Sequence, residues 1–153
     1  MTIGFFDSGI GGLTVLKEAM KVLPGENYLY YADTRNVPYG TKTRQEIVSF
    51  TDRAIECLVN HGAEMVVIAC NTATSAAINL MREKYSIPLI GMEPAVKPAI
   101  QHSCGRKILV TATTFTLSQP KLDDLIRANH AENRVDRLAL DKLVTFAERF
   151  EFS

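Results

Sequence analysis

Short apolar runs alternate with longer segments of helical periodicity along this chain. Runs rich in β-branched and aromatic residues predict strands at residues 3–6, 28–32, 65–69, 88–92, 107–111 and 135–140. Segments with apolar residues three and four positions apart predict helices at residues 13–23, 43–61, 75–84, 96–102, 119–129 and 141–150. This alternation predicts an α/β fold in which helices flank a parallel sheet.

The longest predicted helix, residues 43–61, shows the pattern most clearly. One face of it carries Ile47, Phe50, Thr51, Ala54, Ile55, Leu58 and Val59, and Gly62 follows as a stop signal. We therefore expect this face to lie against the sheet.

Polar loops follow the first three predicted strands. They contain Asp7-Ser8, Pro38-Tyr39-Gly40 and Cys70-Asn71-Thr72. Ligands of open α/β sheets bind outside the carboxyl ends of the strands, where such loops meet. The sequence therefore predicts one polar pocket at this edge.

Cys70 stands between a predicted buried strand and a predicted helix, for which Asn71, Thr72 or Thr74 is the expected N-cap. The positive end of the helix dipole and unpaired backbone N–H groups favour a thiolate, whose unperturbed pKa is about 8.5. The alternative is a buried structural cysteine. Cys57 lies beside an apolar helix face and is interpreted as structural, and Cys104 follows a helix C-terminus, which disfavours a thiolate.

The other polar groups at this edge allow two interpretations each. Asp7 opens a glycine-rich turn without the lysine of a P-loop, so it suits an ammonium group or a proton relay, or else caps the next helix. Tyr39 and Gly40 offer a hydroxyl and a backbone N–H to a carboxylate, or form an ordinary loop. Glu93 adds a further polar group. Threonines 113, 114 and 116 either bind a carboxylate or cap a helix.

Composition narrows the class of protein. The chain has 153 residues, 17 basic and 17 acidic, and a formal net charge of +0, which gives no electrostatic basis for binding nucleic acid. No apolar run approaches the roughly 20 residues that span a bilayer, and the N-terminus lacks the basic region of a secretory signal. The three cysteines and three histidines show no metal-ligand spacing. We expect a cytoplasmic globular protein with neither metal nor membrane association.

Four sequence blocks together resemble the bacterial glutamate racemases of the cofactor-independent aspartate/glutamate racemase family. They are FDSGIGGL at residues 6–13, YAD and PYG at residues 31–33 and 38–40, ACNTAT at residues 69–74, and GMEPA at residues 91–95. The order and spacing of the blocks match, and the match is strongest over residues 3–98.

This resemblance implies a cofactor-independent isomerase in which two cysteines on opposite sides of the substrate exchange the α-proton of glutamate. Cys70 would be one of them, with Asp7 assisting it, and the D-glutamate formed would serve peptidoglycan synthesis. The substrate-binding residues carried over from the resemblance are Asp7, Ser8, Tyr39, Gly40, Asn71, Thr72 and Thr116. The resemblance also implies that the enzyme uses no cofactor and that its small-molecule partner is glutamate. It is compatible with a homodimer.

The second cysteine of the family lies in a Gly-Cys-Thr-His block that these 153 residues do not contain. The apolar pattern of the last predicted helix also continues to Phe152, which indicates a chain cut short or, alternatively, a natural C-terminal docking helix. We therefore expect an N-terminal portion of a two-lobed fold, with residues 1–92 forming the first lobe and residues 93–153 beginning the second. Such a chain would lack one of its two acid–base groups. The competing hypothesis is a carboxylate-binding or structural fragment without chemistry.

Overall fold

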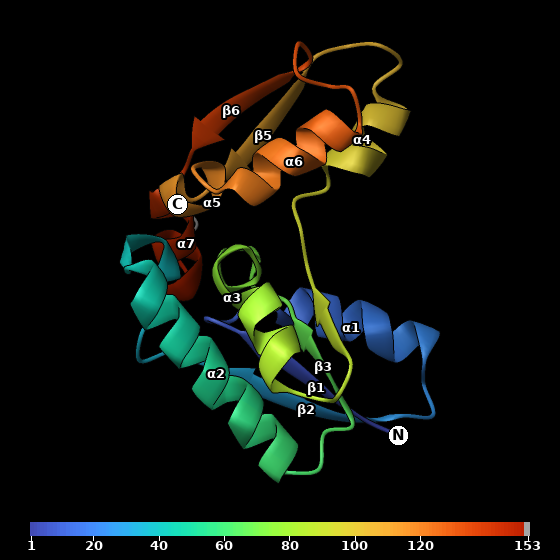
Figure 1. The fold of residues 1–153 in the computed structure, drawn as a ribbon, viewed down its shortest axis with the longest axis vertical. Helices are drawn as coiled ribbons and strands as arrows, with labels where there is room; N and C mark the ends of the chain where they lie inside the picture. Colours follow the sequence, from blue (N-terminus) through green and yellow to red (C-terminus); the bar gives the residue numbers. More distant parts are fainter. Residues whose placement is uncertain (152–153) are drawn as a thin grey trace.

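The computed structural model describes residues 1–151, which form two parallel sheets at opposite ends of the molecule (Figure 1). The first sheet has the order β2-β1-β3-β4, and the second consists of β5 and β6. The strands are β1 (Thr2–Asp7), β2 (Asn27–Ala32), β3 (Met65–Ile68), β4 (Leu89–Gly91), β5 (Ile108–Ala112) and β6 (Val135–Ala139). A single extended segment, residues 92–95, crosses from one sheet to the other.

All strand pairs are parallel, and the register brings the predicted polar loops together. Asp7 lies opposite Ala32, and Phe6 lies opposite Ile68. Asp7, Asp33 and Cys70 therefore leave the sheet at the same edge, as expected for parallel strands.

Helices cover both faces of the first sheet. On one face lie α2 (Arg44–Asn60) and α3 (Asn71–Lys84), and on the other lies α1 (Leu13–Val22) (Figure 1). Five of the predicted apolar-face residues of α2 are buried and the other two, Phe50 and Val59, are partly buried against the same core. A capping box between Thr43 and Glu46 begins α2, and Gly62, with φ +90°, follows its end.

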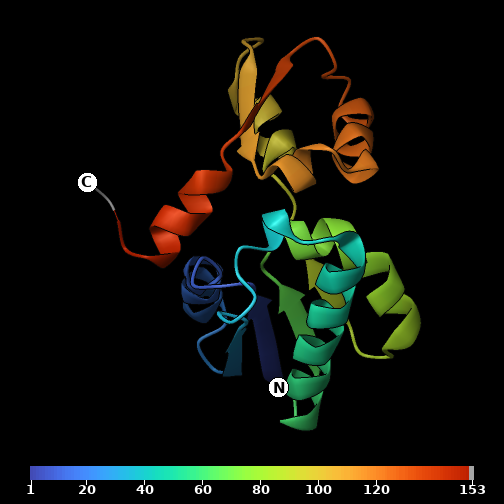
Figure 2. The same cartoon turned by 90° about the vertical axis from the view of Figure 1, so that its left-hand side faces the viewer.

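The second sheet is smaller and is packed on one face. Its helices are α4 (Val96–His102), α5 (Thr114–Leu117), α6 (Pro120–Ala128) and α7 (Asp141–Glu148). The buried residues of its core are Val96, Val110, Leu122, Ile126 and Ala131. Helix α7 leaves this sheet and extends toward the α1 end of the first one (Figure 2).

The predicted α/β class with a parallel sheet flanked by helices is confirmed, and each predicted strand and helix is present with ends shifted by a few residues. One local expectation was wrong. Helix α3 begins at Asn71 with Cys70 itself as N-cap, so neither Asn71, Thr72 nor Thr74 caps it. The segment after β5 forms the short helix α5, which was not among the predicted helices.

The predicted lobe boundary at residues 92 and 93 falls in the segment between β4 and α4, and it stays a prediction. Phe152, the last position of the predicted apolar pattern, lies outside the described residues.

Candidate active site

A cavity of about 570 Å³ lies between the carboxyl edge of the first sheet, the start of α5 and helix α7. All eight site residues proposed from the sequence line it: Asp7, Ser8, Tyr39, Gly40, Cys70, Asn71, Thr72 and Thr116. They come from the three connections that follow β1, β2 and β3 at the edge of the first sheet and from α5 beside the second sheet. Tertiary structure therefore brings the predicted set together in one place.

Cys70 is held at the N-terminus of α3, with its side chain 7% exposed. Its Sγ atom accepts a hydrogen bond from the Ala73 N–H at 3.4 Å, and it lies 3.4 Å from the Ser8 Oγ atom. These contacts favour the thiolate, as the sequence suggested. The N-cap position thus places the sulfur on the cavity wall with a backbone donor directed at it.

The expectation of a readily formed thiolate is nevertheless corrected by the surroundings of Cys70. Burial raises the pKa of the Cys70 thiol above its ordinary value, and the neighbouring carboxylate of Asp7 raises it further. The hydrogen bonds from Ser8 and Ala73 only partly offset these two effects. Without a ligand, the protonated thiol is the favoured state.

Asp7 ends β1 and points its carboxylate into the glycine-rich turn. Its Oδ2 atom accepts the Gly9 N–H at 3.1 Å, and the N-cap of α1 is Gly12, which has no side-chain cap. The interpretation of Asp7 as the cap of α1 is therefore wrong. A Cβ atom at Gly12 would lie 2.7 Å from the Asp7 Cβ, so the turn can pass this close only with glycine.

Tyr39 is almost fully buried, and its hydroxyl donates a hydrogen bond to Asp33 Oδ2 at 2.7 Å. Burial raises the pKa of Tyr39 above its usual value, and the Asp33 carboxylate raises it further, so the phenol stays protonated. Because the Tyr39 hydroxyl donates its proton to Asp33 in this structure, its interaction with a substrate carboxylate stays a prediction. Gly40 lies so near the second sheet that an added Cβ would be 2.8 Å from Thr113.

Three threonine hydroxyls connect the starts of α3 and α5. Thr72 Oγ1 lies 3.2 Å from Thr113 Oγ1 and 3.1 Å from Thr116 Oγ1, and the latter two lie 3.0 Å apart. Thr113 also caps α5, so the capping interpretation holds for it. Thr114 turns away and bonds Asp141. Thr72 and Thr116 are thus both buried at the cavity wall.

The sequence did not identify helix α7 as part of the site. Leu143, Val144, Ala147 and Glu148 line the cavity, and Glu148 Oε1 accepts the Ile10 N–H at 2.9 Å. A Cβ at Gly9 would overlap the Glu148 carboxylate. Nothing in an ordinary amphipathic pattern distinguishes Glu148 from a surface acid, because its partner is 138 residues away in the chain.

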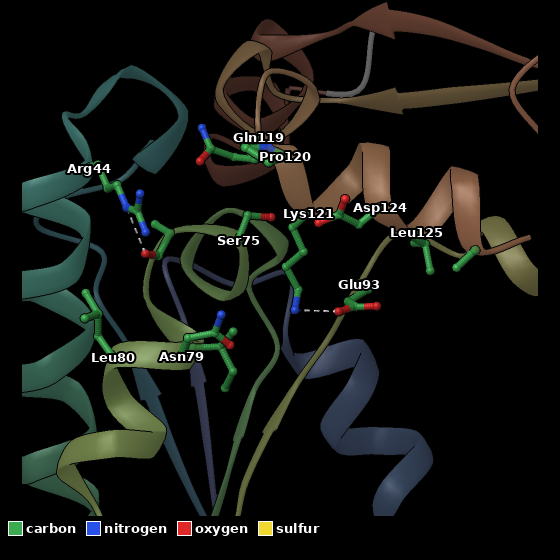
Figure 3. Close-up of a pocket in the computed structure, with 13 residues that line it drawn as sticks. Arg44, Ser75, Asn79, Leu80, Glu93, Gln119, Pro120, Lys121, Asp124 and Leu125 are labelled. Carbon is green, nitrogen blue, oxygen red and sulfur yellow. Dashed lines mark hydrogen bonds and ion pairs between the residues drawn. The ribbon is translucent and has the colours of Figure 1, made fainter.

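A second cavity of about 500 Å³ lies where α3 faces α6 (Figure 3). Lys121 Nζ pairs with Glu93 Oε1 at 2.7 Å across it, and Arg44 Nε donates to the Ala76 carbonyl oxygen at 3.3 Å. Its lining mixes both charge signs and contains no thiol. Glu93 lines both cavities, so the predicted polar group after β4 lies between them, paired with a lysine.

Within residues 1–151, no group of three or more His, Cys, Asp or Glu side chains is arranged to hold a metal ion. Among the same residues, no helix combines the length and apolar character needed to cross a membrane.

Comparison with known proteins identifies relatives along nearly the whole chain. The family model for Asp/Glu/hydantoin racemase matches residues 14–148. The glutamate racemase of Halothermothrix orenii is 55% identical over 152 residues, which are 99% of this chain and 60% of that protein. The chain thus spans about 60% of the length of this curated relative.

Two solved structures show the same fold. Glutamate racemase from Campylobacter jejuni superposes with a TM-score of 0.89 at 33% identity, covering 100% of this chain and 62% of that one. The Escherichia coli glutamate racemase, in complex with L-glutamate and the activator UDP-MurNAc-Ala, gives a TM-score of 0.87 at 32% identity, covering 95% and 55%.

Proposed function

Because the chain belongs to the Asp/Glu/hydantoin racemase family, we propose that Cys70 exchanges the α-proton of a glutamate bound in the cavity. The observation that carries the proposal is the position of the Cys70 sulfur. It lies on the cavity wall at a helix N-terminus, between the Ser8 hydroxyl and the Ala73 N–H. A cysteine so placed can remove a proton from a substrate carbon as the thiolate and return one as the thiol.

The raised pKa of Cys70 fits a base that forms only when substrate is present. Asp7 raises this pKa because its negative charge lies nearby. An ammonium group bound beside Asp7 would neutralise that charge and favour the thiolate. The amino group of glutamate would therefore help to activate the sulfur that removes its α-proton.

The carboxylates of glutamate would be held by neutral donors on the two sides of the cavity. Thr72, Thr116 and Ser8 supply hydroxyls, and the first turn of α3 at Asn71 supplies the positive end of a helix dipole. Tyr39 would shape the cavity wall, since its hydroxyl donates its hydrogen bond to Asp33. Gly40 would offer its backbone to the substrate. This donor set suits a small molecule that carries both charge signs.

The racemase reaction needs a second acid–base group on the opposite side of Cα. Cys57 lies on α2 beside His61, and Cys104 is exposed after α4, so neither lines the cavity. We propose that the 153-residue chain supplies one face of the reaction and does not invert glutamate at a useful rate. We further propose that the whole protein acts in the cytoplasm and provides D-glutamate for peptidoglycan.

The test uses the pure 153-residue chain with L-glutamate and, in parallel, with D-glutamate in D2O. A single thiol exchanges the α-proton only of the enantiomer whose proton faces it, so we expect deuterium at Cα of one enantiomer, measured by proton NMR, without inversion, measured by chiral chromatography. Inversion of either enantiomer would contradict the claim that a second group is missing. Absence of deuterium in both enantiomers would contradict the catalytic proposal.

The second candidate function is carboxylate binding without chemistry, and the raised pKa of Cys70 favours it because a resting thiol is a poor base. The two candidate functions are distinguished by combining deuterium incorporation with the protection of Cys70 by glutamate against alkylation by iodoacetamide. The alkylation is measured in a chain that carries Cys57→Ser and Cys104→Ser. Protection by glutamate without deuterium incorporation would support binding alone. Protection together with incorporation would support the catalytic proposal.

A further inference from the structure

Strand β2 carries two tyrosines whose hydroxyls bond backbone carbonyls at opposite ends of α1. Tyr28 and Tyr30 are two residues apart, so they point to the same face of the sheet, and both are half-buried against α1. The Tyr28 hydroxyl donates to the Leu23 oxygen at 2.6 Å, at the end of α1 far from the cavity. The Tyr30 hydroxyl donates to the Gly9 oxygen at 2.9 Å, in the turn that follows Asp7.

The turn bonded by Tyr30 is held at three successive backbone groups. The Gly9 N–H donates to Asp7, the Gly9 carbonyl accepts from Tyr30, and the Ile10 N–H donates to Glu148. The Tyr30 contact comes from the middle of strand β2, whereas Asp7 is the last residue of β1 and Glu148 is the last residue of α7. The other two partners are carboxylates that line the cavity.

Tyr30 also fits the turn sterically. A Cβ atom at Gly12 would lie 2.9 Å from the Tyr30 hydroxyl and 3.0 Å from the Ala69 Cβ, so the phenol and the turn are in close contact. Glycine residues at positions 9, 11 and 12 give this turn unusual backbone freedom. A fixed donor on a strand restricts that freedom where it would otherwise be largest.

We propose that Tyr30 is a positioning residue of the active site: its hydroxyl fixes the Gly9 carbonyl and thereby the turn from Asp7 to Gly12, so that Asp7 and Ser8 face Cys70 in the cavity. The inference rests on the proposed function and extends it to a residue that does not line the cavity. Burial, followed by the carboxylates of Asp7 and Glu148, raises the pKa of Tyr30 above its usual value. The phenol therefore keeps the proton that it donates.

The first test measures the turn directly and needs no substrate. Amide hydrogen exchange of Gly9 and Ile10 is followed by NMR in wild type, Tyr30→Phe and the matched control Tyr28→Phe. Loss of one neutral hydrogen bond corresponds to about a three- to tenfold change, so Tyr30→Phe should accelerate Ile10 exchange by that factor. Tyr28→Phe should leave it at the wild-type rate. A wild-type rate in Tyr30→Phe, or equal acceleration in both variants, overturns the proposal.

The second test measures the consequence for the site. In a Cys57→Ser/Cys104→Ser background, the glutamate concentration that half-protects Cys70 from iodoacetamide should rise about three- to tenfold with Tyr30→Phe. It should not change with Tyr28→Phe. Unchanged protection in Tyr30→Phe overturns the positioning role even if the turn is looser. If the parent chain itself is not protected, the proposed function fails, while the exchange experiment still decides whether Tyr30 holds the turn.

Discussion

The first sheet is covered by helices on both faces, whereas residues 1–151 cover the second sheet on one face only (Figure 1). The larger of the first sheet's two cores includes Phe6, Ile47, Ile55 and Ile68, each fully buried. In the second sheet, Leu109 and Leu138 are 57% and 45% exposed on the face opposite its small core. The two sheets therefore differ in how much apolar surface each removes from water.

The same two regions also differ in what they give the cavity. The first sheet supplies the sulfur, the Asp7 carboxylate and the Ser8 hydroxyl, all attached to its carboxyl edge. The second supplies the hydroxyl of Thr116 and, through α7, the carboxylate of Glu148. The groups proposed to move protons thus stand on the better-packed region, where their positions are best defined.

The largest expected effect tests where the chemistry resides. Cys70→Ser should lower deuterium incorporation into glutamate by at least about 100-fold, because general acid–base catalysis contributes about 10²–10⁴. Thr116→Val, in α5 beside the second sheet, should raise the glutamate concentration needed by no more than about tenfold, because only one neutral hydroxyl, with its contacts to Thr72 and Thr113, is lost. Proton NMR in D2O measures both variants.

Cys57→Ser is the matched control, since Cys57 lies outside the cavity, and it should behave as wild type. If Thr116→Val lowered deuterium incorporation as much as Cys70→Ser does, the assignment of the proton-transfer groups to the first sheet would be wrong.

The second effect concerns stability. Ile55→Ala removes a fully buried side chain from the core of the first sheet and should lower the free energy of unfolding by about 2–5 kcal/mol. Ile126→Ala makes the same change in the second core, where partly exposed neighbours can relax, so we expect a loss at the low end, about 2 kcal/mol. Urea unfolding followed by circular dichroism gives both values. Equal losses would show that the two cores are equally well packed.

The smallest effect concerns the electrostatics of Cys70. Because Asp7 raises the Cys70 pKa, Asp7→Asn should lower it and speed the alkylation of Cys70 at pH 8 in the Cys57→Ser/Cys104→Ser background. Slower alkylation in Asp7→Asn would contradict the assigned direction.

The same raised pKa has a consequence for stability. A thiol whose folded pKa exceeds its unfolded value of about 8.5 destabilises the native state as pH rises above that value. The wild-type chain should therefore lose more stability above about pH 8.5 than Cys70→Ser does, and thermal unfolding across this range measures the difference.

Most secondary structure could be predicted because it depends on neighbours in the chain. The apolar positions of α2 predicted the face that is buried, and the alternation of strands and helices predicted the parallel order. The candidate site residues of the first sheet could be named because parallel strands deliver their following loops to one edge. Thr116 lies in α5 beside the second sheet, so this rule does not account for it. The predicted N-cap of α3 was displaced from the observed one, Cys70, by one residue or more, because cysteine is not among the usual capping residues.

The amino-acid sequence alone determined the α/β class, the element order and the polar residues that the loops of the first sheet bring to the cavity, because local periodicity and loop position fix them. Tertiary structure decided which hydrogen-bond donors of the cavity already have a partner, such as the Tyr39 hydroxyl, and which charges lie near Cys70. Ser8 meets Cys70 across 62 residues and Ile10 meets Glu148 across 138, so these contacts leave no local pattern. Burial and nearby charge set the protonation of Cys70, and both arise only when distant segments pack together.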